Sequence, residues 1–166
     1  MKIRRLNPLD AEAYLSTRLK ALQNNPEAFG SSYEEEKDQP VEKYIRRFQS
    51  NESTITIGAF VDEQLVGVVT LFRESLAKLQ HRANIVAMYV SPEQRGLGFG
   101  KSLMVEAIQV ANDWAGVEQV YLTVVTTNKP AKKLYASLGF EVFGTEKKAL
   151  KVSDTYFDEE HMVLFL

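Results

Sequence analysis

The sequence predicts one domain of the α/β (α+β) class, in which helices flank a mixed, mostly antiparallel sheet. Apolar, β-branched runs of strand length alternate along the chain with longer segments whose apolar residues repeat at helical spacing. The chain has 166 residues, of which 45% are apolar and 25% are charged, as is usual for one globular domain. We therefore expect a single domain over residues 1–166 with a sizeable core.

The N-terminal part predicts a short strand followed by two helices. Residues 3–6 form the expected strand, and a helix begins near Asp10 and ends before Pro26. Polar residues follow, including the acidic run at residues 34–36. A second helix is expected over residues 41–49, where apolar side chains gather on one side.

The middle of the chain predicts three antiparallel strands. Residues 55–61 and 65–72 are apolar, β-branched runs around the polar residues 62–64, which is a hairpin signal. Residues 83–90 are expected to add the third strand.

A helix, a strand and another helix are predicted next. Residues 101–115 carry apolar side chains at helical spacing, and residues 120–124 alternate as a strand does. Thr127 or Asn128 is expected to cap the second helix, which closes at Leu138-Gly139-Phe140.

The C-terminal residues predict two short strands. Residues 142–143 and 162–166 are apolar enough for this assignment. Residues 147–154 between them are expected to form a loop. No internal repeat, low-complexity tract or linker interrupts the chain.

Composition excludes several kinds of protein. The chain has no cysteine, which excludes disulfides, thiolate catalysis and Cys-based zinc sites and is compatible with a reducing compartment. Its first five residues are too polar to begin a signal peptide, and no apolar run approaches the about 18 residues of a membrane span. With a net charge of −2, nothing predicts nucleic-acid binding. We expect a cytoplasmic protein with neither a nucleic acid nor a membrane as partner.

The run Gln94-Arg95-Gly96-Leu97-Gly98-Phe99-Gly100-Lys101-Ser102 joins a predicted strand to a predicted helix. Glycines at alternate positions let the backbone approach a ligand without Cβ clashes. The free N–H groups and the dipole of a helix start favour an anion there. This arrangement predicts a phosphate-binding loop. Five cations lie close to this loop in the sequence: Arg95, Lys101, Lys129, Lys132 and Lys133. They either help to bind the phosphate or belong to solvated helix faces, which commonly carry such residues.

Two common nucleotide motifs fail at this run by one position. A Walker A loop needs glycine five residues before Gly100, where Arg95 stands, and a start at Gly96 leaves the loop one residue short. A dinucleotide fingerprint would need its third glycine at Lys101. Both motifs are excluded, because their loop geometry depends on the number of residues between the fixed positions.

The pattern Arg95-x-x-Gly98-x-Gly100, preceded by Gln94, resembles the pyrophosphate-binding signature of the GNAT superfamily of acyl-CoA-dependent N-acetyltransferases. Upstream, residues 88–92 look like the end of that family's central strand and the turn after it. Downstream, the family's helix pattern N-x-x-A-x-x-L-Y-x-x-x-G-F is matched by Asn128, Ala131, Leu134, Tyr135, Gly139 and Phe140. The resemblance covers roughly residues 55–166.

The resemblance implies a V-shaped splay between two parallel central strands, with acetyl-CoA bound in the opening and no metal. Main-chain groups of Met88 and Val90 would pair with the pantetheine arm, and the N–H of Met88 or Tyr89 would polarise the thioester carbonyl. The residues that the resemblance assigns to the co-substrate are Met88, Val90, Gln94, Arg95, Gly96, Gly98, Gly100, Lys101, Ser102 and Asn128.

Tyr135 matches the family tyrosine that acts as general acid toward the CoA sulfur. A phenol can give a proton to a departing thiolate. The alternative is a core tyrosine beside Leu134 and Leu138. Asn128 either contacts the cofactor arm, caps its helix, or does both.

No residue is identified as the general base. His81 lies in a polar loop, and His161 is expected to face outward from the last strand. The acidic run at residues 34–36 either lines the site of a cationic acceptor or is a solvated face. Tyr121 and Thr123 lie on a strand that flanks the acceptor channel in the family.

We therefore expect transfer of an acetyl group from acetyl-CoA to a primary amine by direct attack in a ternary complex, because no cysteine can carry an acyl-enzyme. The acceptor stays open among small amines, amino acids, antibiotics and protein amines. The alternative function is a non-catalytic acyl-CoA-binding sensor or scaffold. The expected partners are acetyl-CoA and an amine, with a homodimer as a further possibility.

Overall fold

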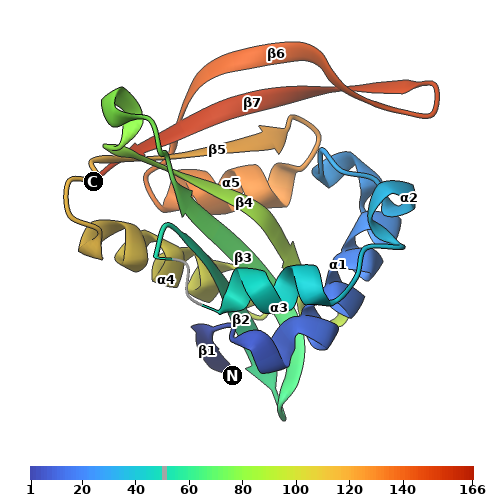
Figure 1. The fold of residues 1–166 in the computed structure, drawn as a ribbon. Helices are drawn as coiled ribbons and strands as arrows, with labels where there is room; N and C mark the ends of the chain where they lie inside the picture. Colours follow the sequence, from blue (N-terminus) through green and yellow to red (C-terminus); the bar gives the residue numbers. More distant parts are fainter. Residues whose placement is uncertain (50–51) are drawn as a thin grey trace.

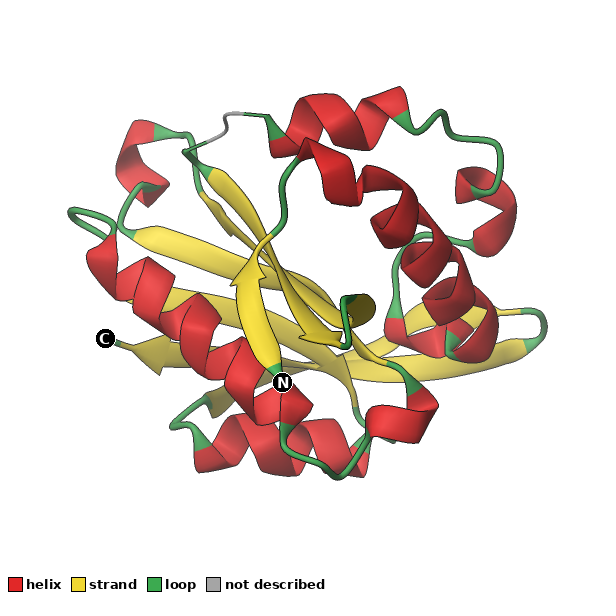
Figure 2. Cartoon of the chain, turned by 90° about the horizontal axis from the view of Figure 1, so that it is seen from below, coloured by secondary structure: helices red, strands yellow, loops and turns green. Residues whose placement is uncertain are grey.

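A computed structural model describes residues 1–49 and 52–166, which form a seven-stranded sheet with helices on both faces (Figures 1 and 2). The sheet order is β1-β2-β3-β4-β5-β7-β6. Only β4 and β5 pair in parallel among these strands, and the other neighbours are antiparallel. The predicted fold class is thus confirmed. The strands are β1 (Lys2–Arg5), β2 (Thr54–Val61), β3 (Gln64–Arg73), β4 (Arg82–Val90), β5 (Gln119–Val125), β6 (Glu141–Val152) and β7 (Thr155–Phe165).

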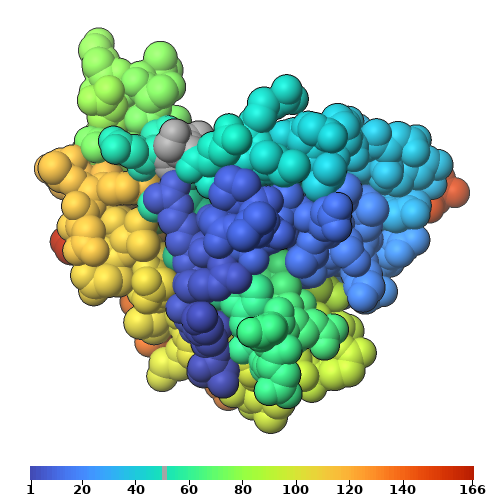
Figure 3. Space-filling model, turned by 60° about the horizontal axis from the view of Figure 1, so that its bottom comes forward, coloured from blue at the N-terminus to red at the C-terminus, as the bar shows by residue number. Residues whose placement is uncertain are grey.

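The helices bury one apolar cluster on each face of the sheet. Helices α4 (Phe99–Asp113) and α5 (Lys129–Ser137) cover the larger cluster, which includes Leu103 and Met104, both fully buried. Helices α1 (Ala11–Asn24), α2 (Tyr33–Glu36) and α3 (Glu42–Phe48) lie over the opposite face. In the space-filling view, the N-terminal residues and the segment up to α3 form a continuous cover there (Figure 3).

One predicted helix boundary shifts and one short helix was not predicted, both for local reasons. Helix α4 begins at Phe99 rather than residue 101, because Gly98 takes the left-handed conformation at φ +89° and buried Phe99 anchors the first turn. The polar stretch after α1 contains the short helix α2, which the sequence reading missed. Its capping box, in which Ser32 and Glu35 satisfy each other's backbone N–H groups, was readable as S-x-x-E.

The prediction of a loop at residues 147–154 is wrong. Strand β6 continues to Val152, and the turn to β7 holds only the next two residues. Both strands are long, and they leave most charged side chains of β6 exposed. The apolar alternation that identifies a half-buried strand is therefore missing, and pairing with β7 holds β6 extended. No helix among the described residues is long and apolar enough to cross a membrane.

Candidate active site

The central feature of the site is a gap between β4 and β5. The two strands pair only at their first three positions, Arg82 with Gln119, Ala83 with Val120 and Asn84 with Tyr121. Beyond Asn84, the β5-facing edge of β4 has no strand partner in the described chain. A bulge at Ala87, where φ is +53° and the register with β3 shifts, bends β4 at this point. The predicted splay is present.

The first cavity, called the glycine-loop cavity, lies where β4 ends and α4 and α5 begin. Its volume is about 580 Å³. Most residues assigned to acetyl-CoA come together in its wall: Met88, Val90, Gln94, Arg95, Gly96, Gly98, Gly100, Lys101 and Asn128. Ser102 does not line this cavity, and its backbone N–H donates to the Gly98 carbonyl at 3.0 Å.

The glycines of the loop have different physical roles. Gly96 and Gly98 have φ values of +77° and +89°, and nothing lies within 4 Å of a Cβ built on either. A ligand can therefore approach both backbones closely. Gly100 packs instead, because its Cβ would lie 3.4 Å from Met88 and from Leu134.

The helix end behind the loop is electropositive. The first-turn N–H groups of α4 have no intrahelical acceptor, and no acidic residue lies in that turn. Lys101 adds a positive charge to the cavity wall. These groups suit a pyrophosphate. Of the nearby lysines, Lys132 instead pairs with Glu160 at 2.9 Å, and Lys129 and Lys133 do not line the cavity.

Arg95 fixes the loop through its own side chain. Its Nε donates to the carbonyl of Val90 at 3.0 Å, and its Nη2 donates to Oδ1 of Asn25 at 2.7 Å. The guanidinium therefore ties the end of β4 to the end of α1. The sequence reading missed Asn25, which also lines the cavity.

Tyr135 and Asn128 lie at the inner end of the glycine-loop cavity. Tyr135 is buried, and burial raises its pKa to about 12, so its hydroxyl keeps its proton at neutral pH. Asn128 caps α5 by accepting the Ala131 N–H at 3.2 Å through Oδ1. Capping leaves its Nδ2 donors for a ligand.

The second cavity, called the helix-side cavity, lies between the sheet and α1–α3. Its volume is about 560 Å³. A small space of about 70 Å³ lies between the two cavities. Tyr135, Met88 and Asn128 line both this space and the glycine-loop cavity, while Ala87, Val86 and Thr123 line both this space and the helix-side cavity. The splay therefore connects the two cavities, and we call the small space the channel.

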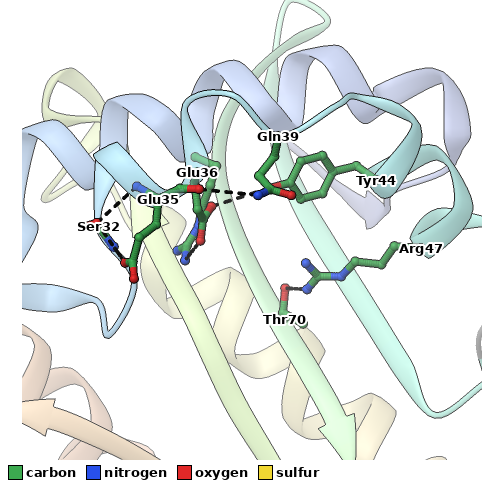
Figure 4. Close-up of polar contacts among 8 residues, drawn as sticks. Ser32, Glu35, Glu36, Gln39, Tyr44, Arg47 and Thr70 are labelled. Carbon is green, nitrogen blue, oxygen red and sulfur yellow. Dashed lines mark hydrogen bonds and ion pairs between the residues drawn. The ribbon is translucent and has the colours of Figure 1, made fainter.

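The helical wall of the helix-side cavity is a polar network (Figure 4). Arg18 of α1 binds Glu36 of α2 through two hydrogen bonds, at 3.1 and 3.0 Å. Burial alone would raise the pKa of Glu36, but the hydrogen bonds and charge of Arg18 outweigh it and lower that pKa. Arg47 of α3 donates to Oγ1 of Thr70 on β3 at 3.2 Å. Glu36, the last residue of the acidic run, is thus a half-buried ion-pair partner.

The sheet wall of the helix-side cavity carries His161 and Glu159. His161 lines the helix-side cavity, so the expectation that it faces away is wrong. Its Nδ1 lies 3.3 Å from Oγ1 of Thr123, and its Nε2 lies 3.1 Å from Oε2 of Glu146. Glu159 lines the same cavity, and burial, followed by the charge of Glu146, raises its pKa. His81 lines none of the three spaces.

Sequence reading missed most of the helix-side cavity. Arg47, Arg82 and Glu159 come from α3, β4 and β7 and share no motif. Arg18 gave one signal, because it stands among the apolar positions of its helix. A charged side chain on a core-facing stripe is rarely buried without a partner.

Comparisons with known proteins agree with this geometry. The model of the acetyltransferase (GNAT) family matches residues 19–140. The L-amino acid N-acetyltransferase AaaT of Escherichia coli is 32% identical over 63% of this chain and 64% of its own length. A streptothricin acetyltransferase of Escherichia coli is 33% identical over 72% of this chain and 66% of its own length. The matches thus span about two thirds of these relatives.

Solved structures share the fold over the whole chain. An acetyltransferase of the GNAT family from Streptococcus pneumoniae superposes with a TM-score of 0.86 at 21% identity, covering 99% of each chain. The putative acetyltransferase yncA from Salmonella typhimurium, solved with its cofactor acetyl-CoA, gives a TM-score of 0.87 at 18% identity, covering 100% of this chain and 94% of its own. By its family match and its fold, this chain belongs to the GNAT family of acetyltransferases.

Proposed function

We propose that this protein transfers an acetyl group from acetyl-CoA, bound in the glycine-loop cavity, to a primary amine bound in the helix-side cavity. The observation that carries the proposal is the channel, which joins the two cavities beside Tyr135. The names of the two Escherichia coli relatives, both acetyltransferases, and the acetyl-CoA in yncA support it.

Each group of residues then has a binding role. The backbones of Gly96 and Gly98, the N-terminus of α4 and Lys101 bind the pyrophosphate. Main-chain groups of Met88 and Val90 and the amide of Asn128 hold the pantetheine arm along the unpaired edge of β4, with Gln94 and Arg95 shaping the loop. Ser102 stays a prediction, since it lies outside the cavity wall.

The reaction is a direct displacement. The amine nitrogen forms a bond to the carbonyl carbon of the thioester, the carbon–sulfur bond breaks, and the thiolate leaves with its electron pair. A backbone N–H at Met88 or Tyr89 stabilises the developing oxyanion. Tyr135 donates a hydrogen bond to the sulfur. Full proton transfer from a phenol of pKa about 12 to a thiolate of an ordinary thiol is uphill by about 5 kcal/mol. Tyr135 therefore acts chiefly by stabilising the thiolate's charge.

Direct transfer predicts the pattern of initial rates. Because both substrates must be aligned together, double-reciprocal plots at several fixed acetyl-CoA concentrations should intersect. CoA release with a panel of primary amines provides the assay. Parallel lines, with an acetylated protein isolated after incubation with acetyl-CoA alone, would contradict direct transfer. CoA binding without release of CoA by any amine would favour the non-catalytic sensor.

His161 is the proton acceptor of this proposal. If its Nε2–H donates to Glu146, its Nδ1 is free to accept a proton from the Thr123 hydroxyl, and Thr123 in turn faces the channel. His161→Asn should lower kcat/KM about 10- to 100-fold at neutral pH. The loss should shrink as the pH rises, because more of the amine is then deprotonated in solution.

Rate profiles from pH 6 to 10 measure this effect. Glu159→Gln is the matched variant, since Glu159 lies on the same strand and lines the same cavity. A loss in His161→Asn that is constant across this range would show that the ring is needed only for structure. A pH-dependent loss in Glu159→Gln alone would assign the base to Glu159.

A further inference from the structure

The helix-side cavity carries more positive than negative side chains. Its described wall holds four cations, Arg18, Lys43, Arg47 and Arg82, and two carboxylates, Glu36 and Glu159. Glu36 is already bound by Arg18. Glu159 is then the one carboxylate of the described wall that forms no ion pair. A polycationic amine would need a carboxylate for each of its charges.

Three of these cations, Lys43, Arg47 and Arg82, form no ion pair among the described residues. Arg47 donates to the neutral hydroxyl of Thr70, and its guanidinium carbon lies 5.7 Å from the centre of the Tyr14 ring. Arg82 lies over the ring of Tyr121, with 4.0 Å between its guanidinium carbon and the ring centre. Neither forms an ion pair within residues 1–49 and 52–166.

Two donor atoms of the arginines that line this cavity also lack acceptors. Nε of Arg82 and Nη1 of Arg18 are buried and have no hydrogen-bond partner in the described chain. Leaving a buried charged donor unpaired is costly, so these two atoms call for a partner that the described chain does not supply. A guanidinium presents a planar fork of donors that matches a carboxylate.

We propose that the acceptor is a small amine that also carries a carboxylate, as an amino acid does, and that Arg47 and Arg82 bind that carboxylate. This inference rests on the proposed acetyl transfer and names the substrate class of its second cavity. The carboxylate lies between Arg82, at the end of the splay where β4 and β5 still pair, and Arg47, which is held at Thr70 opposite Val86. The amine lies toward the channel, near Thr123, His161 and Glu159.

The spacing along the sheet suits such a molecule. Arg82 lies over Tyr121, and Thr123 lines the channel. Tyr121 and Thr123 are two residues apart on the same face of β5. Two residues of a strand span about 7 Å. That distance accommodates a compact amino acid together with its hydrogen bonds at each end.

The test compares each amino acid with its own carboxamide, which keeps the amine and removes the negative charge. CoA release is measured with L-amino acids, their amides and spermidine, for the wild-type protein, Arg47→Gln and Arg82→Gln. Arg46→Gln is the matched control, since Arg46 is an exposed neighbour on α3 that does not line the cavity. Thermal melting checks that each variant is folded.

We expect the wild type to prefer an acid over its amide. Arg47→Gln and Arg82→Gln should each lower kcat/KM for that acid about 10- to 100-fold, mainly through KM, as the loss of a charge-assisted hydrogen bond does. Their values for the amide should hardly change, so the preference for the acid should shrink, while Arg46→Gln keeps it.

Two results would contradict the proposal in different ways. If the wild type releases CoA equally well with amides or better with spermidine, the carboxylate site is overturned and acetyl transfer stands. This readout needs no variant, so it holds even if Arg82→Gln does not fold. If no amine in the panel releases CoA, the proposed acetyl transfer fails, and this inference fails with it.

Discussion

Gly98→Glu should abolish CoA binding, with affinity falling at least about 100-fold, while the protein stays folded. Gly98 has φ +89°, and a Cβ at this position would meet no atom within 4 Å. The new side chain therefore fits without a clash, and its backbone strain is about 1 to 2 kcal/mol. Its carboxylate would occupy the space in front of the α4 N-terminus, where we place the pyrophosphate. Calorimetric titration with CoA measures the loss.

Two controls separate charge from strain and from global effects. Gly98→Ala carries the strain at the same φ without the charge, so it should weaken CoA binding much less. Gly144→Glu adds the same charge at an open glycine of β6 that does not line the glycine-loop cavity, and it should bind CoA normally. If Gly98→Glu binds CoA as tightly as the wild type, the loop is only a turn and the assignment of the glycine-loop cavity is wrong.

Tyr135→Phe should lower kcat about 10- to 1000-fold with little change in the KM for acetyl-CoA. The substitution keeps the buried ring and removes only the hydroxyl. The ring packs against Phe140, with 6.1 Å between the two ring centres. What is lost is a hydrogen bond that forms fully when charge develops on the sulfur. Steady-state rates at saturating amine measure this loss.

Tyr156→Phe is the matched control, because Tyr156 is 49% exposed on β7 and lines neither cavity. It should retain wild-type kcat. An unchanged kcat in Tyr135→Phe, with the chemical step shown to limit the rate, would mean that Tyr135 serves only the core.

The glycine-loop cavity was predictable because it is local in sequence. The loop, the start of α4 and the cap of α5 lie within two short segments. Each segment carries residue types that a particular backbone conformation favours. Gly96 and Gly98 are needed for positive φ, and Asn128 for a helix cap. Such residues can be read from their order alone.

The helix-side cavity was not predictable for the opposite reason. Its wall combines side chains from α1, α2, α3 and five strands, which only the tertiary fold brings together. His161 illustrates this limit. A strand residue points its side chain to one face of the sheet or the other. For His161, the face is decided by the register of β7 with β5, in which His161 pairs with Thr123.

The β6–β7 hairpin marks a second limit of sequence reading. A loop was expected from Lys147 to Asp154, yet residues up to Val152 belong to β6. Their strand forms through pairing with β7 and not through burial of an apolar face. The pairing of β6 with β7 also shapes the site, because it brings Glu146 Oε2 to 3.1 Å from Nε2 of His161.

A crystal structure of the protein with CoA would test the central claim most directly. We predict that the pyrophosphate contacts the backbones of Gly96 and Gly98, that the pantetheine arm follows β4 past Met88, and that the sulfur lies beside the Tyr135 hydroxyl at the mouth of the channel. The helix-side cavity should stay open to an acceptor. A CoA whose pyrophosphate lies away from the glycine loop, or whose sulfur lies outside the channel, would contradict the account.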